Sequence, residues 1–577
     1  AVLCAYYAAR LSRTRARGRD SREPPRTDVS RSNDDDDDDD ARRAEEKDAA
    51  DAHDAVAALA RRFGASFPDA ETEALVELAV ADLRLFTRQD SKRRVLGALG
   101  AVASRVPASA LSESAHARVG EALSRLLDDD DAAARRAGGP RAAGGDTLAA
   151  SASVSGDGGF CLEETLVASR YYASLWRCAH LCASRDGARW PEPVVAGLAG
   201  RVRRFLSFGV DAATRRSADA APAETPNPNA SASGRGYVPP HARDADVADA
   251  ASDSDASDAE SSAGETPRGD RFGASRVRAN AASFVASLAR ADPRGAHPFW
   301  PRLLPTSAAQ FSRSPSTTRR GPCTLARAML HDPSPRVRAA AAVAVAQLLD
   351  APASRAYLSA AELKLDPTTG LALRRVNFAS LSSTLGDLAV ATHGALTLAI
   401  KAERSLACVP SACKAAAALA DAAPFARLPR NLVPDAALAA WRRVSSLASS
   451  RARDASGGEG SEDPERVSAQ VALLSALAAT LGAEGAPARF RAALGGGGET
   501  DPGDGSVESA ADSEPARDAR DLREIIPGLA SLAGDATVAV AVRCEAFGAL
   551  RAAAATHAAA VAAHWRDARV QAALPGA

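Results

Sequence analysis

A helix with one apolar face recurs along this chain, and that recurrence limits the possible folds more than any other feature. Its clearest copy begins with a turn at residues 332–335, in which Ser334 suits the helix N-cap and Pro335 the first helical position. The residues that follow at i, i+4, i+7 and i+11 share one face of the predicted helix and are all apolar: Val337, Ala341, Ala344 and Leu348. This helix needs neighbours that cover its apolar face.

The same register returns elsewhere in the sequence. The further copies are Val95, Leu99, Val102 and Val106; Val277, Ala281, Phe284 and Leu288; Val467, Ala469, Val471, Leu474 and Ala478; and Val542, Ala546, Ala549 and Ala553. Helices that each have one buried face cover one another when they stack in a row. No segment shows the alternation of a strand. The pattern therefore predicts an all-α fold, a HEAT/armadillo-type α-solenoid with disordered acidic and Pro/Ser-rich inserts.

Composition agrees with a long array of helices. Aromatic residues make up only 4% of the chain and alanine fills many apolar positions, so each helix buries little area and stability must be collected over many helices. Lys and Arg total 71 and Asp and Glu total 72, which gives no general reason to expect nucleic-acid or membrane-surface binding. No run reaches the roughly 18 apolar residues that a membrane span requires.

The eight cysteines are sparse and scattered, which is typical of an intracellular protein with reduced thiols, so we expect the cytoplasm or the nucleus. Because the chain starts with Ala1 rather than Met, we interpret it as a fragment. Cys178, His180 and Cys182 are spaced closely enough to raise the question of a metal. A structural zinc site needs four ligands, however, and no second pair stands nearby. We expect buried cysteines there and no metal.

Nothing in the sequence points to catalysis. The nine histidines show no paired spacing, and no Ser/His/Asp or Cys/His set is recognisable. The glycine run at 495–498 lacks the Lys-Ser/Thr that completes a phosphate loop. We therefore expect a protein that is not an enzyme, without catalytic residues and without a cofactor.

Shifts in composition divide the chain. The aspartates at 34–40 form a charge block that we expect not to fold, and residues 211–270 lack the large apolar side chains that a core requires. The expected order is a helix end plus a basic and acidic disordered loop at 1–41, helical repeats at 42–127, a linker at 128–159, helical repeats at 160–210, a disordered insert at 211–270, a HEAT-repeat domain at 271–450, a helical repeat at 451–494, a linker at 495–517 and a helical repeat at 518–577.

The expected insert contains two serines in an acidic context. Ser252 and Ser257 each have an acidic residue three positions on, which is the pattern that acid-directed kinases favour. Phosphate here would add charge to an acidic tract and create a docking handle for basic grooves. We predict both serines as possible phosphorylation sites.

The insert also contains the short motif Tyr237-Val-Pro-Pro-His-Ala-Arg243. Pro239 and Pro240 favour an extended backbone, and Tyr237 provides an anchor, with Arg243 closing the motif. It resembles a segment in the N-terminal tails of some RNA helicases linked to translation. It is a possible peptide motif for partner recognition, and an extended strip that packs on the helices is the alternative.

Four segments, in order, resemble the family of HEAT repeat-containing protein 6. They lie at 252–260, 276–300, 332–349 and 422–441, and together they look like that family's domain of unknown function. The family protein is longer, so the chain looks like its N-terminal half. The resemblance implies a right-handed α-solenoid of antiparallel helix pairs.

The resemblance also implies a polar ladder. In HEAT repeats generally, an Asp in the turn between the paired helices and an Arg on the second helix form contacts from repeat to repeat. Asp332 and Arg338 match that spacing and are the predicted ladder residues. Arg278 and Arg543 match only the Arg, because the nearest upstream Asp lies two residues too far away in both cases.

These observations favour a non-enzymatic scaffold that mediates protein–protein interactions, with other proteins as partners, no direct contact with nucleic acid and no membrane. The alternatives are an RNA- or translation-associated adaptor that uses residues 237–243, and a nuclear transport-type cargo binder. The charge of the solenoid groove separates the three. A continuous Lys/Arg stripe favours nucleic acid, an acidic groove favours basic cargo, and a mixed groove with apolar patches favours protein partners.

Overall fold

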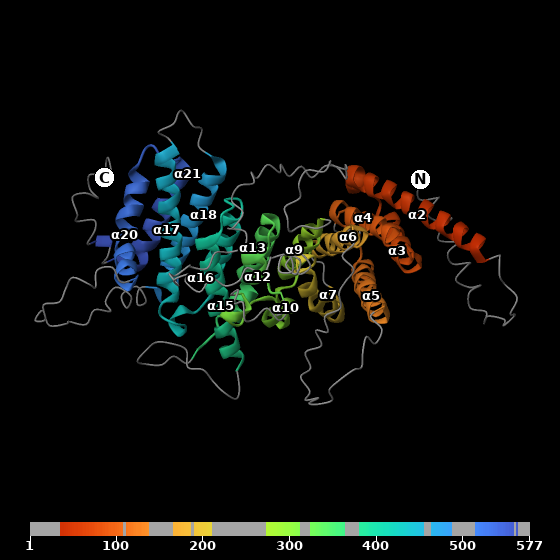
Figure 1. Cartoon of the computed structure of the whole chain (residues 1–577), viewed down its shortest axis with the longest axis horizontal. Helices are drawn as coiled ribbons and strands as arrows, with labels where there is room; N and C mark the ends of the chain where they lie inside the picture. The colour runs from red at the N-terminus through yellow and green to blue at the C-terminus, as the bar shows by residue number, and fades with distance from the viewer. Residues whose placement is uncertain are drawn as a thin grey trace, which may run out of the picture. The chain divides into compact units, whose positions relative to one another are not determined.

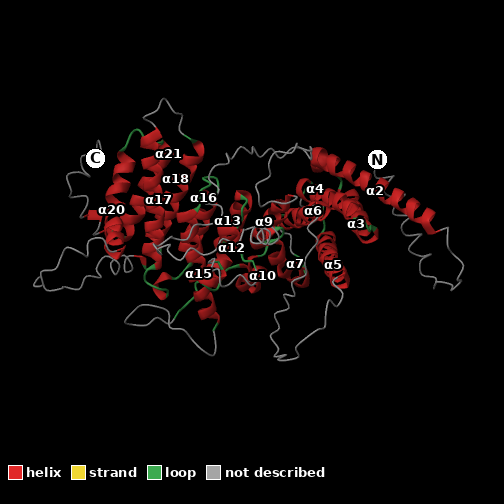
Figure 2. Cartoon of the chain, viewed as in Figure 1, coloured by secondary structure: helices red, strands yellow, loops and turns green. Residues whose placement is uncertain are grey.

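The computed structural model describes residues 35–107, 111–137, 166–185, 190–210, 273–311, 323–363, 380–454, 463–486, 514–558 and 561–562. All regular secondary structure in these ranges is helical, without a strand, which confirms the all-α prediction (Figure 2). The predicted insert at 211–270 lies outside the described residues, and with it Tyr237, Pro239, Pro240, Arg243, Ser252 and Ser257.

The chain divides into two compact units, of which the first comprises residues up to Gly209 together with Asp270–Gly295. Its helices are α2 (Asp35–Phe63), α3 (Asp69–Leu85), α4 (Gln89–Arg105), α5 (Glu113–Ala137), α6 (Leu166–Ala183), α7 (Glu192–Phe205) and α9 (Ala274–Ala291). The helices α2, α4, α6 and α9 pack one after the other in a row, and α3, α5 and α7 lie along it (Figure 1).

The second unit comprises Val210–Gly269 and Ala296–Ala577. Its helices are α11 (Trp300–Leu303), α12 (Leu325–His331), α13 (Pro335–Asp350), α14 (Pro352–Leu358), α15 (Leu381–Ala402), α16 (Val409–Ala422), α17 (Leu432–Asp454), α18 (Pro464–Gly482), α20 (Glu514–Gly534) and α21 (Val540–Thr556). The short helix α10 (Pro293–Ala296) joins the two units in sequence.

Helices of the second unit pair along the chain and stack in two rows (Figure 1). We call α13, α16, α18 and α21 the B row, and the helices that precede them, α12, α15, α17 and α20, the A row. Each B-row helix packs on its own A-row partner. The helices α13, α16 and α18 each also pack on the next B-row helix. Pairs of helices are thus the structural unit that repeats here.

The predicted apolar stripes lie on the buried faces of these helices. Val337, Ala341, Ala344 and Leu348 of α13 are at most 1% exposed, as predicted. The stripes that begin at Val95, Val277 and Val542 are buried as well. Alanine at many of these positions lets neighbouring helix backbones approach closely, at the cost of little buried area per residue.

The stripe predicted from Val467 was only partly right. Ala469 and Leu474 are buried as predicted, whereas Val467, Val471 and Ala478 are only half-buried. The buried face of α18 also includes Leu473, Ala476, Leu477 and Thr480. The two leucines Leu473 and Leu477 bury more apolar area than the valines, and they set the rotation of the helix.

The largest aromatic cluster fills the core of the first unit between α6, α7 and α9. Tyr172 and Trp176 of α6 lie with their ring centroids 5.0 and 5.2 Å from that of Phe205, and Trp176 lies 5.3 Å from Phe284 of α9. Phe208 completes the cluster, 5.7 Å from Tyr172. These large side chains fill a part of the core that small alanines alone would leave unfilled.

Two predicted boundaries are corrected by helices that carry acidic residues. Helix α2 begins at Asp35, so most of the aspartate block at 34–40 is helical, because acidic residues in the first turns of a helix are stabilised by the helix dipole. Helix α5 continues to Ala137, beyond the expected linker start at 128.

The C-terminal part of α5 is held by ion pairs. Asp131 accepts hydrogen bonds from Arg201 Nε at 3.2 Å and Arg204 Nη1 at 2.6 Å, both on α7, and Asp128 pairs with Arg201. These partners explain why an Asp-rich stretch remains helical. At the other end of the chain, α20 begins at Glu514, inside the linker expected at 495–517.

The placement of α13 predicts opposite effects for two neighbouring substitutions. Leu348→Asp places an uncompensated carboxylate in the buried stripe, and we expect a loss of stability on the order of several kcal/mol. Arg336 is exposed, so Arg336→Asp serves as the control and should change the thermal midpoint little. Equal thermal midpoints for the two variants, measured by circular dichroism, would contradict the assigned face.

Candidate functional site

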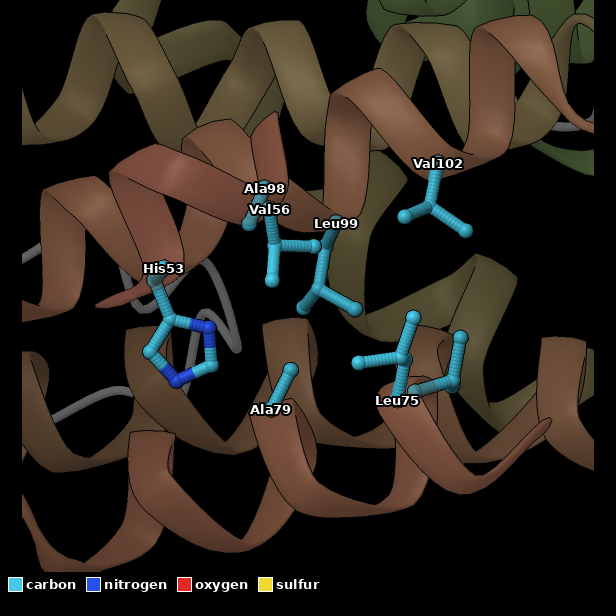
Figure 3. Close-up of a pocket in the computed structure, with 8 residues that line it drawn as sticks. His53, Val56, Leu75, Ala79, Ala98, Leu99 and Val102 are labelled. Carbon is cyan, nitrogen blue, oxygen red and sulfur yellow. The ribbon is translucent and has the colours of Figure 1, made fainter. Parts of the chain in front are cut away.

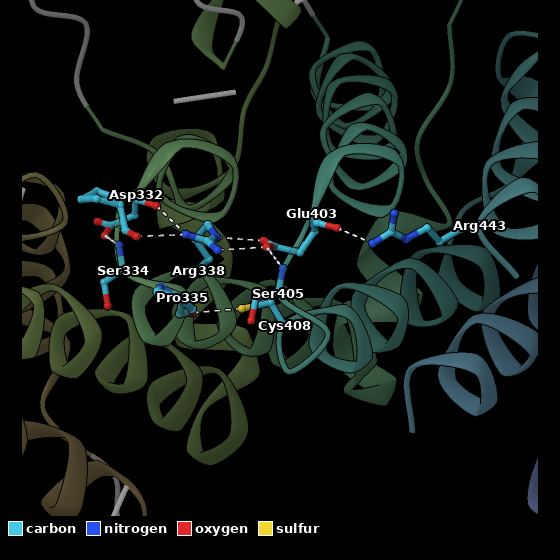
Figure 4. Close-up of polar contacts among 9 residues, drawn as sticks. Asp332, Ser334, Pro335, Arg338, Glu403, Ser405, Cys408 and Arg443 are labelled. Atoms are coloured by element: carbon cyan, nitrogen blue, oxygen red, sulfur yellow. Dashed lines mark hydrogen bonds and ion pairs between the residues drawn. The ribbon is translucent and has the colours of Figure 1, made fainter. Parts of the chain in front are cut away.

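Arg338 of α13 lies at a buried polar centre that joins two consecutive helix pairs (Figure 4). Its Nε and Nη2 donate to Oε2 and Oε1 of Glu403 at 2.8 and 2.9 Å, a two-pronged arrangement that fixes both side chains. The side chains are only 4% and 5% exposed. Glu403 follows directly after α15, so the ion pair connects the α12–α13 pair with the α15–α16 pair.

Arg338 and Glu403 make further hydrogen bonds at this centre. Arg338 Nη1 donates to the carbonyl oxygens of Asp332 and Pro333 at 3.0 and 3.2 Å. The backbone carbonyl of Glu403 accepts a hydrogen bond from Arg443 Nη2 of α17 at 2.7 Å. The centre thereby extends to α17 in a third helix pair.

The predicted ladder residues Asp332 and Arg338 contact each other, because Arg338 of α13 donates to the backbone carbonyl of Asp332 in the preceding turn. The ion pair of Arg338, however, is with Glu403. The Asp332 carboxylate accepts the backbone N–H of Ser334 at 2.9 Å, which shapes the turn into α13. Sequence reasoning missed Glu403, which lies 65 residues after Arg338. A usable signal was its place in the turn before α16, equivalent to that of Asp332 before α13.

This acidic turn recurs at every A-to-B connection of the second unit that the structure describes. In each, a carboxylate oxygen accepts the backbone N–H two residues later: Asp332 from Ser334 at 2.9 Å, Glu403 from Ser405 at 2.9 Å, Asp463 from Glu465 at 3.0 Å and Asp535 from Thr537 at 2.9 Å. The hydrogen bond holds the turn and presents the next helix in a fixed direction. Asp535, too far from Arg543 for the ladder spacing, has the same role in its turn.

Arginines at the matching helix position bind backbone carbonyls. Arg543 Nε donates to the carbonyl of Ala533 near the end of α20 at 3.1 Å, and Arg278 Nη1 donates to the carbonyl of Phe208 at 2.8 Å. Arg338 makes the equivalent bond to Asp332. Cations that bind the carbonyls after a helix satisfy acceptors that the helix leaves open. The shared role of this arginine is therefore carbonyl capping, and at Arg338 the ion pair is added to it.

The first unit contains a buried His53–Asp82 pair, and His53 also lines a small cavity (Figure 3). His53 Nε2 lies 2.8 Å from Asp82 Oδ2, and both residues are 2% exposed. The other side chains around the cavity are apolar: Val56, Leu75, Val76, Ala79, Ala98, Leu99 and Val102. It has room for about one water molecule, which is too little for a substrate.

The side chain of His180 points to a different neighbour from the side chains of Cys178 and Cys182. Cys178 and Cys182 are buried with their sulfur atoms 4.0 Å apart, which confirms the expectation of buried cysteines. His180 Nδ1 is hydrogen-bonded to Ser287 Oγ at 2.6 Å on α9. The contact with Cys182 and burial raise the pKa of the Cys178 thiol well above its usual value, and a protonated thiol is a poor metal ligand and nucleophile.

Among the described residues, no group of three or more His, Cys, Asp or Glu side chains is arranged to hold a metal ion. Burial lowers the pKa of His116 and of His393 to about 4, so both imidazoles are neutral at physiological pH. None of the helices in the described part of the chain is both long and apolar enough to cross a membrane.

Residues 276–481 match the family model of a domain of unknown function, DUF4042. No curated protein matches the chain. The matched range contains the Arg338–Glu403 centre and the acidic turns at Asp332, Glu403 and Asp463. The family match and the best-defined polar centre of the second unit therefore coincide in sequence.

Removal of one partner of the buried pair should be costly. Arg338→Met leaves the Glu403 carboxylate buried and unpaired, and we expect a loss of about 3–5 kcal/mol in the free energy of unfolding. The matched control is Arg355→Met, since Arg355 pairs with Asp350 at the surface, where an ion pair contributes about 0–1 kcal/mol. Urea unfolding followed by circular dichroism measures both. An Arg338→Met midpoint no lower than that of Arg355→Met would contradict the assigned role of the pair.

Proposed function

We propose that this chain is a HEAT-type α-solenoid of the HEAT repeat-containing protein 6 family and acts as a non-enzymatic scaffold for other proteins. The pairing of helices into an A row and a B row, the acidic turn in each pair and the capping arginine support the HEAT assignment. The DUF4042 match at 276–481 supports the family, because the resemblance to it covers much of the same range. None of the cysteines in the described ranges forms a disulfide bond, which favours the cytoplasm or the nucleus.

The observation that carries the functional proposal is the character of the exposed B-row face. On α13, α16 and α18 this face is turned away from the paired A-row helix and from the neighbouring B-row helices. Its exposed residues are Arg336, Val343, Lys414, Asp421, Ser468 and Ser475. Basic, acidic, small and apolar side chains alternate along it.

A mixed face of this kind fits protein partners better than nucleic acid. Nucleic-acid binding relies on many Lys and Arg side chains that neutralise successive phosphates, and on the described B-row face Arg336 and Lys414 are separated by Val343 and followed by Asp421. Small per-repeat rotations give a solenoid a concave side, along which an extended partner makes many small contacts. The RNA-adaptor and cargo-binder alternatives gain no specific support from this face.

The proposal is tested with the full chain, tagged and purified from cells together with its partners. We expect the partner set to survive RNase treatment and to be reduced by a double substitution on the B-row face, Val343→Asp with Lys414→Glu. The matched control places Asp387→Lys and Ser446→Asp on the exposed side of the A row, and should retain the partners. Purified partner and chain should then form the complex directly.

Two results would contradict this proposal. If RNase, or deletion of residues 237–243, removes most partners while the B-row variant keeps them, the adaptor function is the correct one. If both double variants retain all partners, the B-row face is not the binding surface. Circular dichroism and thermal midpoints of the variants separate loss of binding from loss of fold.

A further inference from the structure

The helices α6 and α9 of the first unit carry basic side chains and no acidic residue. Four of their arginines are exposed, Arg170 and Arg177 on α6 and Arg276 and Arg290 on α9. The members of each pair are separated by a whole number of double turns, so they lie on one side of their helix. We call these four arginines the α6–α9 basic face.

Hydrogen bonds between α6 and α9 bring the two pairs of arginines to one surface. Asn280 Nδ2 donates to the backbone carbonyl of Ala173 at 2.8 Å, and His180 Nδ1 lies 2.6 Å from Ser287 Oγ. Asn280 and Ser287 lie on the side of α9 that also carries Arg276 and Arg290. The side of α9 with the two arginines is therefore the side that meets α6.

His180 marks the junction of the two helices and senses both pairs of arginines. Burial lowers the pKa of His180, and the positive charges of Arg290 and Arg177 lower it further. One arginine from each helix therefore lies close enough to the same imidazole to act on it electrostatically.

Much of the positive charge on this face is not neutralised within the described part of the chain. Arg170, Arg177 and Arg276 form no ion pair there. On α4, the neighbouring helix of the row, Arg93 pairs with Asp90 and Arg94 with Asp51. The arginines of α4 are thus compensated by carboxylates, whereas those of α6 and α9 are available to a partner.

We propose that the α6–α9 basic face binds an extended, carboxylate-rich segment of a partner protein. At 1.5 Å per residue, Arg170 and Arg177 stand about 10 Å apart along α6. An extended chain covers that distance in about three residues, so Asp or Glu at every third position would meet successive arginines. This face lies in the first unit, and the inference does not depend on what the B row of the second unit binds.

The same geometry disfavours nucleic acid and phosphorylated segments. Bases of a single strand stack on exposed aromatic rings, but the rings of α6 and α9 are buried: Tyr171, Tyr172, Trp176 and Phe284. The unpaired arginines also end at α4, which limits the number of successive phosphates that the row could neutralise. Phosphorylated side chains are recognised by arginines that cluster on one group, whereas Arg170 and Arg177 stand apart.

Fluorescence anisotropy with the full chain tests this surface. The probe is a fluorescein-labelled peptide with Glu at every third position among Ser and Gly. We expect saturable binding, and an affinity about tenfold lower for Arg170→Glu with Arg177→Glu, because two attractions become repulsions. The matched control is Arg61→Glu with Arg84→Glu, which makes the same change of net charge at exposed positions of α2 and α3 and should leave the affinity unchanged.

A variant on the other helix keeps the test decisive if the first double variant perturbs the fold. Arg276→Glu, on α9, should also weaken binding, and circular dichroism checks the fold of every variant. A peptide of the same composition with its Glu residues gathered at one end should bind more weakly than the spaced peptide.

Several results would overturn the proposal. They are absence of binding, equal affinity of the two double variants, and equal affinity of the spaced and gathered peptides. A single-stranded RNA probe that binds more tightly than the peptide, and loses affinity in the same variants, would overturn it in favour of nucleic acid. Binding that appears only after deletion of residues 211–270 would overturn it in favour of the chain's own acidic residues.

Discussion

The buried ion pair between Arg338 and Glu403 is the contact on which the arrangement of the second unit depends most. Neighbouring helix pairs otherwise meet through alanine-rich stripes, which allow close approach but bury little area and fit several rotations of one helix against the next. The side chains of the ion pair are 4% and 5% exposed, so rotation of one helix that separated the two groups would leave a charge without a partner inside the protein. The pair therefore fixes how the α15–α16 pair sits on the α12–α13 pair.

The same chemistry reappears in weaker forms along the rows. Acidic residues at the A-to-B turns hold the backbone of the turn, and arginines such as Arg543 and Arg278 bind the carbonyls of a preceding segment. The backbone carbonyl of Glu403 also accepts a hydrogen bond from Arg443 of the next A-row helix. One glutamate thus contacts three helix pairs, and the acidic residues at 463 and 535 share its turn-forming role.

Much of the helical fold was predictable because its signal is local. The i, i+4, i+7, i+11 spacing from Val337, Val277, Val95 and Val542 identified the buried faces. It could do so because the residues of each face belong to one helix and are close together in the sequence. In α18 the prediction was right for Ala469 and Leu474 but wrong for Val467 and Val471, because the larger leucines at 473 and 477 decide which face is buried through contacts with other helices.

The candidate site was predictable only in part for the same physical reason. Arg338 stands out because its turn and helix are contiguous, but its ion-pair partner lies 65 residues later, where the only signal was the place of Glu403 in the turn before α16. The helical aspartates after Asp34 were also missed, because like charge in a row was weighed without the stabilising helix dipole. A contact between distant segments decides the first case, and the local effect of the helix dipole decides the second.

The interaction of Arg338 with Glu403 is measured most directly by a double-mutant cycle. The cycle comprises Arg338→Met, Glu403→Leu and the double variant, with the free energy of unfolding obtained from urea titration. If the pair fixes the helix pairs against each other, the double variant is less destabilised than the sum of the single variants, with a coupling energy of about 2–3 kcal/mol. A coupling energy near zero would contradict this account.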